Sequence, residues 1–408
     1  MTTAAPTRGR TAIRSGVAGQ HPSLHSFHPN ERRALQRIDW GARSSAAFYR
    51  SLEAALDRGS ESGSVDPVRN PYTPGAGQHP PELAGREREI QRFGVLLERV
   101  AHGRPERGVI LTGPRGSGKT VLLNTFRSMA VQRTWGTGRI EARPGRSVRQ
   151  PIAAAVRTAL RALAPRHRAP ERIEHALGVL ASFARAGTGD GSDRAAQAGP
   201  RRGPGTDAAA VPGRADSGDL ETDLSELLLD AASVAADLGA GIALFVDELQ
   251  DVPAADVSAL CAACHELAQN GGPLVLVGAG LPHLPAVLSA GKGYSERLFR
   301  YARVDRLSRS AADHALTAPA LAEGARFDAD ALEALYEASG GHPFLVQAYG
   351  KAVWDLALRS PITADDVRSA VSEADEELAV PPASPEHRDR RPRGPVAFPP
   401  DREVPGSP

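Results

Sequence analysis

The stretch Gly113-Pro114-Arg115-Gly116-Ser117-Gly118-Lys119-Thr120 points to the fold that we expect for this chain. It has the spacing G-x-x-x-x-G-K-T. The residues before it, 108–112, are apolar and β-branched enough to predict a short buried strand, and residues 121–126 begin a helical pattern. In this strand–loop–helix setting the motif predicts a phosphate-binding loop rather than a chance glycine-rich turn.

The residue types of this loop suit phosphate chemistry. Glycines let the backbone bend so that several N–H groups point at one anion, and the following helix adds its positive N-terminal end. Lys119 can reach the β- and γ-phosphates of a nucleotide, and the Thr120 hydroxyl can ligate Mg²⁺. We therefore predict a nucleotide and Mg²⁺ as ligands, and the loop residues that bind the nucleotide are Gly113, Pro114, Gly116, Ser117, Gly118, Lys119 and Thr120.

A second motif is the continuous apolar run 242–246, which ends in Asp247 and Glu248. Such a run predicts a strand buried on both faces, as in a parallel sheet. Acidic residues at its carboxyl end lie at the ligand edge of an open α/β sheet. Downstream of a phosphate-binding loop, we predict that Asp247 and Thr120 hold the Mg²⁺ and that Glu248 polarises the attacking water as general base. The alternative is a strand followed by an acidic turn.

Composition sets wide bounds on the 408-residue chain. The formal net charge is +1, so composition offers no argument for a nucleic-acid partner. The 41 glycines and 33 prolines make up about 18% of the chain, against a usual ~12%, which predicts disorder where they gather. The N-terminus lacks the apolar run of a signal peptide, and no apolar stretch is long enough for a membrane span. We therefore expect a cytoplasmic protein with no membrane partner.

The pattern along the chain predicts four parts. Residues 1–68 are expected to be a poorly structured extension with short helices, and its last ten residues a linker. The phosphate-binding core follows, with an expected disordered insertion at 186–218 and a last strand at Arg303–Leu307. Helices are predicted at about 309–323, 328–338 and 342–358, and a fourth starts at a capping box formed by Thr363 and Asp366. A disordered tail, 379–408, ends the chain.

Four segments in fixed order resemble one family. They are 82–87 (ELAGRE), 245–250 (FVDELQ), 277–282 (VGAGLP) and 340–344 (GGHPF). With the phosphate-binding loop they resemble the AAA+/STAND group of P-loop ATPases, in particular the ORC-like or archaeal-type AAA ATPases of bacteria, over about residues 70–378. The resemblance implies ATP hydrolysis by an α/β P-loop domain, 69–308, with a parallel five-stranded sheet flanked by helices, followed by an α-helical lid, 309–378.

The same resemblance implies further site residues. Gly85 and Arg86 on one side, and His342 and Pro343 of the lid on the other, are expected to contact the adenine side of the nucleotide. Arg297, or Arg300 close to it, is a candidate arginine finger that acts on the γ-phosphate of a neighbouring subunit, which requires an oligomer. The alternative for both arginines is an exposed basic helix face.

Two departures from the family pattern matter. AAA+ enzymes usually carry a polar sensor residue at the end of the strand after the Asp-Glu motif, whereas this chain has Gly278-Ala279-Gly280 there. This predicts slow hydrolysis. Many ORC-like relatives also carry a winged-helix domain after the lid, and the matching region here is a short Pro/Arg-rich tail, so no direct DNA-binding domain is expected.

The string Cys261-Ala262-Ala263-Cys264-His265 matches the haem-attachment pattern C-x-x-C-H. We reject that interpretation and expect no haem, because the chain lacks an export signal and because Leu260, Cys264 and Leu267 fall at helical spacing as a core face.

The sequence thus favours a slow, Mg²⁺-dependent ATPase whose nucleotide state moves the lid. A nucleotide-gated signalling or scaffold switch with little turnover is the alternative, because the weakly patterned segments are of the kind that bind protein partners. A P-loop kinase for a small molecule is a third and weaker hypothesis. It would need an acceptor pocket and an arginine-rich lid, whereas the helices expected after Leu307 resemble the AAA+ lid.

Overall fold

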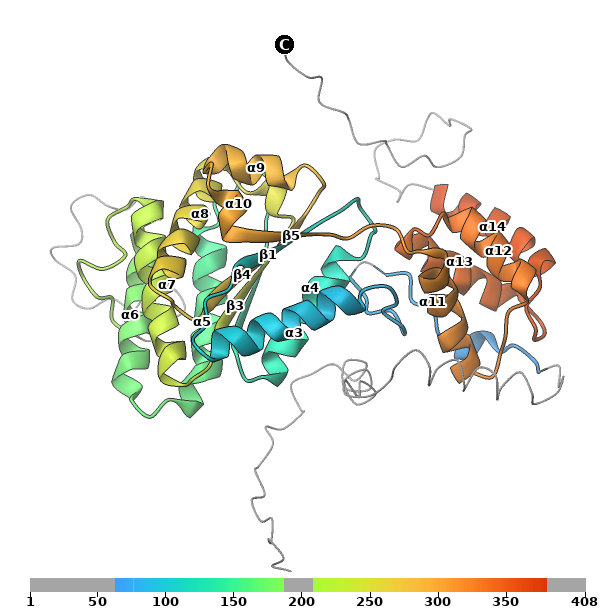
Figure 1. Ribbon diagram of the computed structural model, residues 1–408, viewed down its shortest axis with the longest axis horizontal. Coiled ribbons are helices and arrows are strands. Elements are labelled where there is room, and N and C mark those ends of the chain that lie inside the picture. The colour runs from blue at the N-terminus through green and yellow to red at the C-terminus, as the bar shows by residue number, and fades with distance from the viewer. Residues whose placement is uncertain (1–62, 76, 187–207, 380–408) are drawn as a thin grey trace, which may run out of the picture. The chain divides into compact units, whose positions relative to one another are not determined.

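The computed structural model describes residues 63–75, 77–186 and 208–379 of the 408-residue chain (Figure 1). The predicted extension up to residue 62, the middle of the predicted insertion and the predicted tail from residue 380 lie outside the described residues. Within the described ranges, none of the helices combines the length and the hydrophobicity that a membrane span requires.

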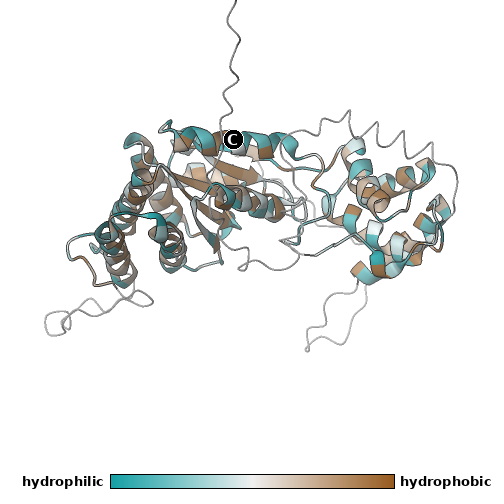
Figure 2. Cartoon of the chain, turned by 90° about the horizontal axis from the view of Figure 1, so that it is seen from below, coloured by the Kyte–Doolittle hydropathy of each residue, from teal (hydrophilic) through white to brown (hydrophobic). Residues whose placement is uncertain are grey.

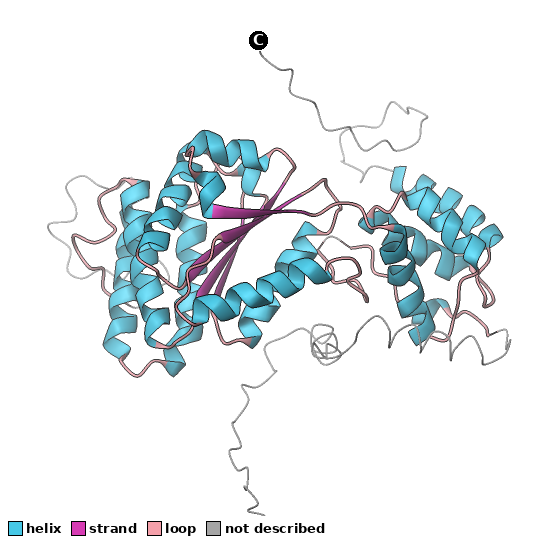
Figure 3. Cartoon of the chain, in the orientation of Figure 1, coloured by secondary structure: helices cyan, strands magenta, loops and turns pink. Residues whose placement is uncertain are grey.

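Five parallel strands form one sheet, drawn in magenta in Figure 3. They are β1 (Gly108–Thr112), β2 (Gly136–Glu141), β3 (Ile242–Asp247), β4 (Leu274–Gly280) and β5 (Phe299–Arg303). Their order is β2-β3-β4-β1-β5, and every neighbouring pair is parallel. The carboxyl ends of β3, β4 and β1 therefore lie side by side at one edge. The predicted fold class, a P-loop α/β core with a parallel five-stranded sheet flanked by helices, is confirmed.

The strands bury side chains on both faces of the sheet. On β3, Ala243 and Phe245 belong to one apolar cluster, whereas Leu244 and Val246 belong to another. Successive side chains of a strand point to opposite faces, so a continuous apolar run is what a sheet covered on both sides requires. Figure 2 shows the strands as mainly hydrophobic and the helices with both hydrophobic and hydrophilic residues.

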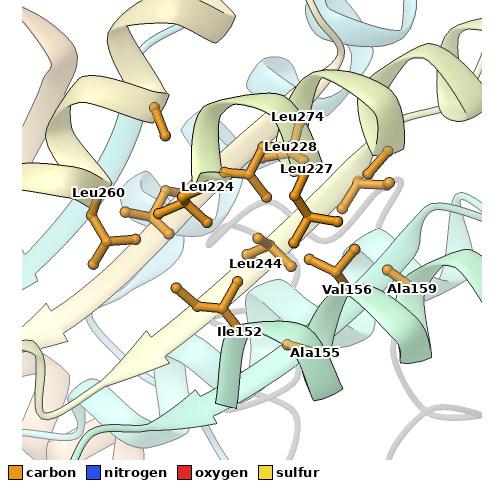
Figure 4. Close-up of a cluster of buried hydrophobic side chains, with 14 of the residues drawn as sticks. Ile152, Ala155, Val156, Ala159, Leu224, Leu227, Leu228, Leu244, Leu260 and Leu274 are labelled. Carbon is orange, nitrogen blue, oxygen red and sulfur yellow. The ribbon is translucent and has the colours of Figure 1, made fainter. Parts of the chain in front are cut away.

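Helices supply the two clusters. On one face, α3 (Glu87–Ala101) and α4 (Lys119–Gln132) bring together Phe93 and Phe126, whose rings stack with centroids 4.2 Å apart. The cluster on the other face takes residues from α5 (Arg149–Leu163), α6 (Pro170–Ala186), α7 (Leu220–Asp237), α8 (Ala254–Gln269), α9 (Leu284–Gly291) and α10 (Ser295–Leu298). Figure 4 shows Ile152, Leu227 and Leu244 of this second cluster directed toward one another.

In the described part of the chain, four helices after the sheet form a third apolar cluster, and we call them the lid: α11 (Arg309–Ala322), α12 (Ala329–Ser339), α13 (Pro343–Leu356) and α14 (Ala364–Ala379). The sequence pattern predicted these helices to within about two residues at the ends that it specified. The capping box before α14 is confirmed: the backbone N–H of Thr363 donates to Asp366 Oδ2 (2.9 Å), and the backbone N–H of Asp366 donates to Thr363 Oγ1 (3.3 Å).

The segment before the P-loop domain packs on the lid. We predicted a linker up to Val68, but Val65 is buried in the lid cluster and the 3₁₀ helix η2 (Pro67–Arg69) follows it. The indole N–H of Trp354 donates to the carbonyl of Asp66 (2.9 Å), and the Tyr72 hydroxyl donates to the carbonyl of Leu316 (2.6 Å). Polar and proline-rich sequence conceals this packing, because single apolar side chains anchor the segment.

Two other expectations differ from the structure. The last strand is Phe299–Arg303 rather than Arg303–Leu307, because β5 is an edge strand that needs fewer apolar residues than its neighbours. Residues 208–218 of the predicted disordered insertion are packed: the backbone N–H of Ser217 donates to the buried Asp223 (2.8 Å), which also pairs with Arg149 (2.9 Å). A buried carboxylate requires such partners, and they order the chain around it.

Candidate functional site

The predicted phosphate-binding loop connects β1 to α4 at the carboxyl edge of the sheet. Gly116 and Gly118 have φ angles of +73° and +90°, a left-handed conformation that favours glycine. Gly113 is restricted by space instead, since a Cβ there would lie 2.0 Å from the carbonyl oxygen of Val304. The loop ends at the N-terminus of a 14-residue helix, whose positive end favours an anion held by the loop.

Lys119, the first residue of α4, turns its side chain back onto the loop. Its Nζ donates to the carbonyl oxygens of Gly113 (2.8 Å) and Pro114 (2.7 Å), and the residue is 7% exposed. Burial lowers the pKa of Lys119, and the negative charges of Glu248 and Asp247 act in the opposite direction. The ammonium group therefore lies within the electrostatic reach of both acidic residues that the sequence singled out.

The end of β3 brings the predicted metal ligands together. Asp247 is 4% exposed, and its carboxylate accepts a hydrogen bond from the backbone N–H of Glu248 (3.1 Å). Burial raises the pKa of Asp247, and the neighbouring Thr120 side chain and the Glu248 N–H oppose that rise. A hydroxyl and a carboxylate from neighbouring parts of the sheet edge are hard oxygen donors of the kind that Mg²⁺ prefers. The residues present therefore fit that ion.

Glu248 occupies an unusual backbone conformation for a residue with a side chain. Its φ and ψ angles are +50° and +42°, in the left-handed region, just before the 3₁₀ helix η4 (Leu249–Asp251). Such a conformation costs about 1–2 kcal/mol for a residue other than glycine and often occurs at functional sites. The Glu248 carboxylate accepts a hydrogen bond at Oε2 from the side-chain amide of Gln250 (2.7 Å).

Arg86 reaches the loop from the start of α3. The residue is 9% exposed, and its guanidinium donates to the carbonyls of Ser117 (3.3 Å) and Asp305. Burial lowers the pKa of Arg86, whereas Glu89, Glu87 and Asp305 raise it. Gly85 before it has a φ of +71°, and a Cβ there would lie 3.0 Å from the Cβ of Ala311 in the lid. Of the predicted pair, Arg86 thus contacts both the loop and the segment that follows β5, and Gly85 lies against the lid.

His342 contacts the same loop from the lid. It is 7% exposed, and its Nε2 lies 2.9 Å from the carbonyl oxygen of Arg115. Because a carbonyl only accepts, Nε2 carries the hydrogen. Burial lowers the pKa of His342, the hydrogen bond to Arg115 raises it, and Arg306 and Lys119 lower it further. Pro343 follows as the first residue of α13, where its fixed φ suits a helix start.

Comparison with known proteins identifies the domain around this site. Residues 82–277 match the family described as "AAA ATPase domain", a range that includes the phosphate-binding loop and the end of β3. The chain contains an AAA ATPase domain. The predicted membership of the AAA+ P-loop ATPases is thereby confirmed. No curated protein sequence matches the chain significantly.

Among solved structures, the chain is similar to the RuvB Holliday junction branch migration motor of Thermotoga maritima (18% identity, 74% of each chain, TM-score 0.41). It is similar to Cdc6p from Pyrobaculum aerophilum (16% identity, 78% of this chain and 75% of that chain, TM-score 0.43). It is also similar to Aeropyrum pernix Orc1 in complex with DNA (15% identity, 73% and 67%, TM-score 0.37).

The sequence did not single out Gln250 in this AAA ATPase domain. At the end of β4, Gly278, Ala279 and Gly280 offer no polar side chain, as the sequence shows. The Gln250 amide lies there instead: the backbone N–H of Leu281 donates to its Oε1 (3.1 Å). A signal was present, because a polar residue two positions after Glu248 and a glycine-ended strand are both visible in the sequence, but only the fold brings them together.

The two candidate arginine fingers do not share a helix face. Arg297 is an exposed residue of α10, whereas Arg300 is a half-buried residue of β5 opposite Val109 of β1. Burial lowers the pKa of Arg300, and the positive charge of Arg92 lowers it further. The alternative of one exposed basic helix face for both residues is therefore wrong. Of the two, Arg297 is the more accessible.

The C-x-x-C-H string lies in α8, as the helical pattern predicted. Cys261 is buried, and burial raises the pKa of its thiol to about 11. The ring of His265 packs against that of Tyr294, with centroids 4.8 Å apart. Within residues 63–75, 77–186 and 208–379, no three His, Cys, Asp or Glu side chains are grouped so that they could hold a metal ion.

Proposed function

We propose that this AAA+ protein binds ATP with Mg²⁺, hydrolyses it slowly to ADP and phosphate, and uses nucleotide state to move the lid against the sheet. The observation that carries the proposal is the grouping, at one edge of the sheet, of Lys119 and Thr120 from the start of α4 with Asp247 and Glu248 from the end of β3. A protein that only bound phosphate would need the loop but not the two acidic residues.

Each residue has a defined task in this proposal. The loop N–H groups and Lys119 bind the β- and γ-phosphates, for which Lys119 exchanges its two carbonyl partners for phosphate oxygens. Glu248 accepts a proton from the water that attacks the γ-phosphorus, as the bond to the β-phosphate oxygen breaks and ADP leaves. Thr120 and Asp247 would hold Mg²⁺, which neutralises charge on the phosphates when bound.

Lid movement is proposed from the contacts on the outer side of the loop. His342 hydrogen-bonds the Arg115 carbonyl, and Arg86 hydrogen-bonds the Ser117 carbonyl. A change in loop conformation on binding or loss of the γ-phosphate alters these acceptors and so the position of the lid. We place Gly85, Arg86, His342 and Pro343 on the adenine side of the nucleotide.

Arg297 gives a reason to expect self-association. It is exposed on α10, and as an arginine finger it would complete the site of a neighbouring copy. We propose a homo-oligomer or a complex with a protein partner.

A nucleotide-gated switch with little turnover is the second candidate. The end of β4 favours it, because Gly278 and Gly280 have no side chain that contacts an attacking water. In that case ATP binding sets the lid position for a partner, and hydrolysis is incidental.

The decisive experiment measures steady-state ATP hydrolysis by the full chain with bound nucleotide quantified, for the wild type and for Glu248→Gln. The exposed Glu376→Gln in α14 serves as a matched control. We expect a wild-type turnover below about 1 s⁻¹, at the low end for enzymes, which vanishes in Glu248→Gln while ATP remains bound. Glu376→Gln should behave as the wild type.

Two other results would decide differently. If all three proteins bind ATP tightly and none of them hydrolyses it, the nucleotide-gated switch is the better account. Turnover unchanged in Glu248→Gln removes the proposed general base and with it the assigned mechanism.

A further inference from the structure

The end of β4 is occupied by a side chain from another element. Gln250 lies in the 3₁₀ helix after β3, and it joins two groups of the site. Its Oε1 accepts a hydrogen bond from the backbone N–H of Leu281, the first residue after β4 (3.1 Å). Its Nε2 donates to Oε2 of Glu248 (2.7 Å).

The backbone fixes the direction of this amide. The N–H of Leu281 can only donate, so the oxygen of the Gln250 amide must face it. The amide nitrogen then faces Glu248 and donates to a carboxylate, which is a charge-assisted hydrogen bond. One carboxylate oxygen is held in this way, and the other oxygen is not used by this contact.

The glycines of β4 make room for this arrangement. A Cβ on Gly280 would lie 2.6 Å from the amide oxygen of Gln250 and 2.7 Å from Cδ2 of Leu284, the end of a side chain that can shift. A Cβ on Gly278 would lie 2.7 Å from Cδ2 of Leu249, the residue before Gln250. Neither glycine has a positive φ angle, so space and not backbone conformation excludes larger residues here. The two glycines therefore leave space for the side chains of Leu249 and Gln250, which follow each other in η4.

We propose that Gln250 is the positioning residue for Glu248, and that it fixes the general base against the end of β4. This inference rests on the proposed ATPase activity. A general base is effective when a third group orients it toward the proton that it takes. The side-chain amide from η4 performs that task at a strand end that has no polar side chain of its own.

The test compares Gln250→Ala, Gly280→Ala and the double variant in the full chain. Gln250→Ala should lower kcat about tenfold or more with an unchanged dissociation constant for ATP, because a hydrogen bond to a charged group is lost only at the base. Gly280→Ala should give a similar fall, since its methyl group displaces the amide. The double variant should fall no further, because the amide that the added methyl group displaces is already gone and the remaining neighbour, Cδ2 of Leu284, can shift.

Exposed Gln91 in α3 gives the control variant, Gln91→Ala, which should match the wild type. Effects of Gln250→Ala and Gly280→Ala that multiply in the double variant would show separate structural damage and overturn the inference. An unchanged or raised kcat in Gln250→Ala would overturn it as well.

Glu248→Gln separates this inference from the proposed function. If wild type turns over ATP and Glu248→Gln does not, an unaffected Gln250→Ala refutes the positioning role alone. If wild type and Glu248→Gln both bind ATP without turnover, the ATPase activity is refuted and the positioning role falls with it.

Discussion

Two glycine-rich strand ends lie next to each other in the sheet and use glycine for different reasons. The loop after β1 contains Gly116 and Gly118 with positive φ angles, and Gly113 closely approaches a neighbouring backbone carbonyl. At the end of β4, Gly278 and Gly280 have ordinary backbone angles and leave space for side chains of η4. A glycine in a sequence therefore has no fixed meaning until its neighbours are known.

The largest effect should come from substitution of Lys119, at the end of the loop after β1. Lys119→Ala removes the ammonium group that we assign to the β- and γ-phosphates, so ATP affinity should fall about 1,000-fold, or ~4 kcal/mol. Equilibrium binding of ATP measures it, with Lys351→Ala in α13 as the control. Unchanged affinity in Lys119→Ala would show that the loop does not bind nucleotide as proposed.

Gly113→Ala should destabilise the fold by about 3 kcal/mol, because its Cβ would lie 2.0 Å from the carbonyl oxygen of Val304, which is backbone and cannot turn away. Denaturant unfolding measures this loss. Gly103→Ala is the control: its φ is +69° but no atom lies within 4 Å of the added Cβ, so it should cost only about 1 kcal/mol. Equal losses in the two variants would refute the role of space at Gly113.

Gly278→Ala should cost less, about 1.5 kcal/mol. Its Cβ would approach Cδ2 of Leu249 (2.7 Å) and Cδ1 of Ile110 (2.9 Å), which are the ends of side chains and can shift. The same unfolding experiment ranks it against Gly113→Ala. If Gly278→Ala proved the more damaging of the two, the contrast between the strand ends would be wrong.

The smallest expected effect is the pH dependence of stability that His342 contributes, the lid residue that contacts the loop after β1. Burial lowers the pKa of His342, so the folded state favours the neutral ring. Below about pH 6.5 the unfolded chain takes up the proton first, and the free energy of unfolding should fall until the folded-state pKa is passed. Each unit of pKa difference is worth about 1.4 kcal/mol.

Thermal or denaturant unfolding at pH 7.5 and 5.5 tests this dependence. His342→Gln should lose less stability on acidification than the wild type, whereas the exposed His102→Gln should lose as much as the wild type. The same pH dependence in all three proteins would refute the contribution of His342.

Much of the candidate site was predictable because its residues lie in two short, contiguous stretches of sequence. The loop at 113–120 and the acidic end of the strand at 242–247 are contiguous, and their spacing reflects the chemistry directly. The last strand was misplaced by four residues because Val304 and Leu307 are buried although they follow β5. Apolar pattern alone does not separate a strand residue from a buried loop residue.

Local sequence was enough to predict the P-loop, the pair Asp247–Glu248, the family and the four lid helices, since each depends on residues close together along the chain. Other contacts needed the folded chain: Gln250 spans from Glu248 to the end of β4, His342 bonds the Arg115 carbonyl, and Tyr72 packs in the lid. These contacts join residues that lie far apart in sequence, or depend on backbone direction, which no local pattern encodes.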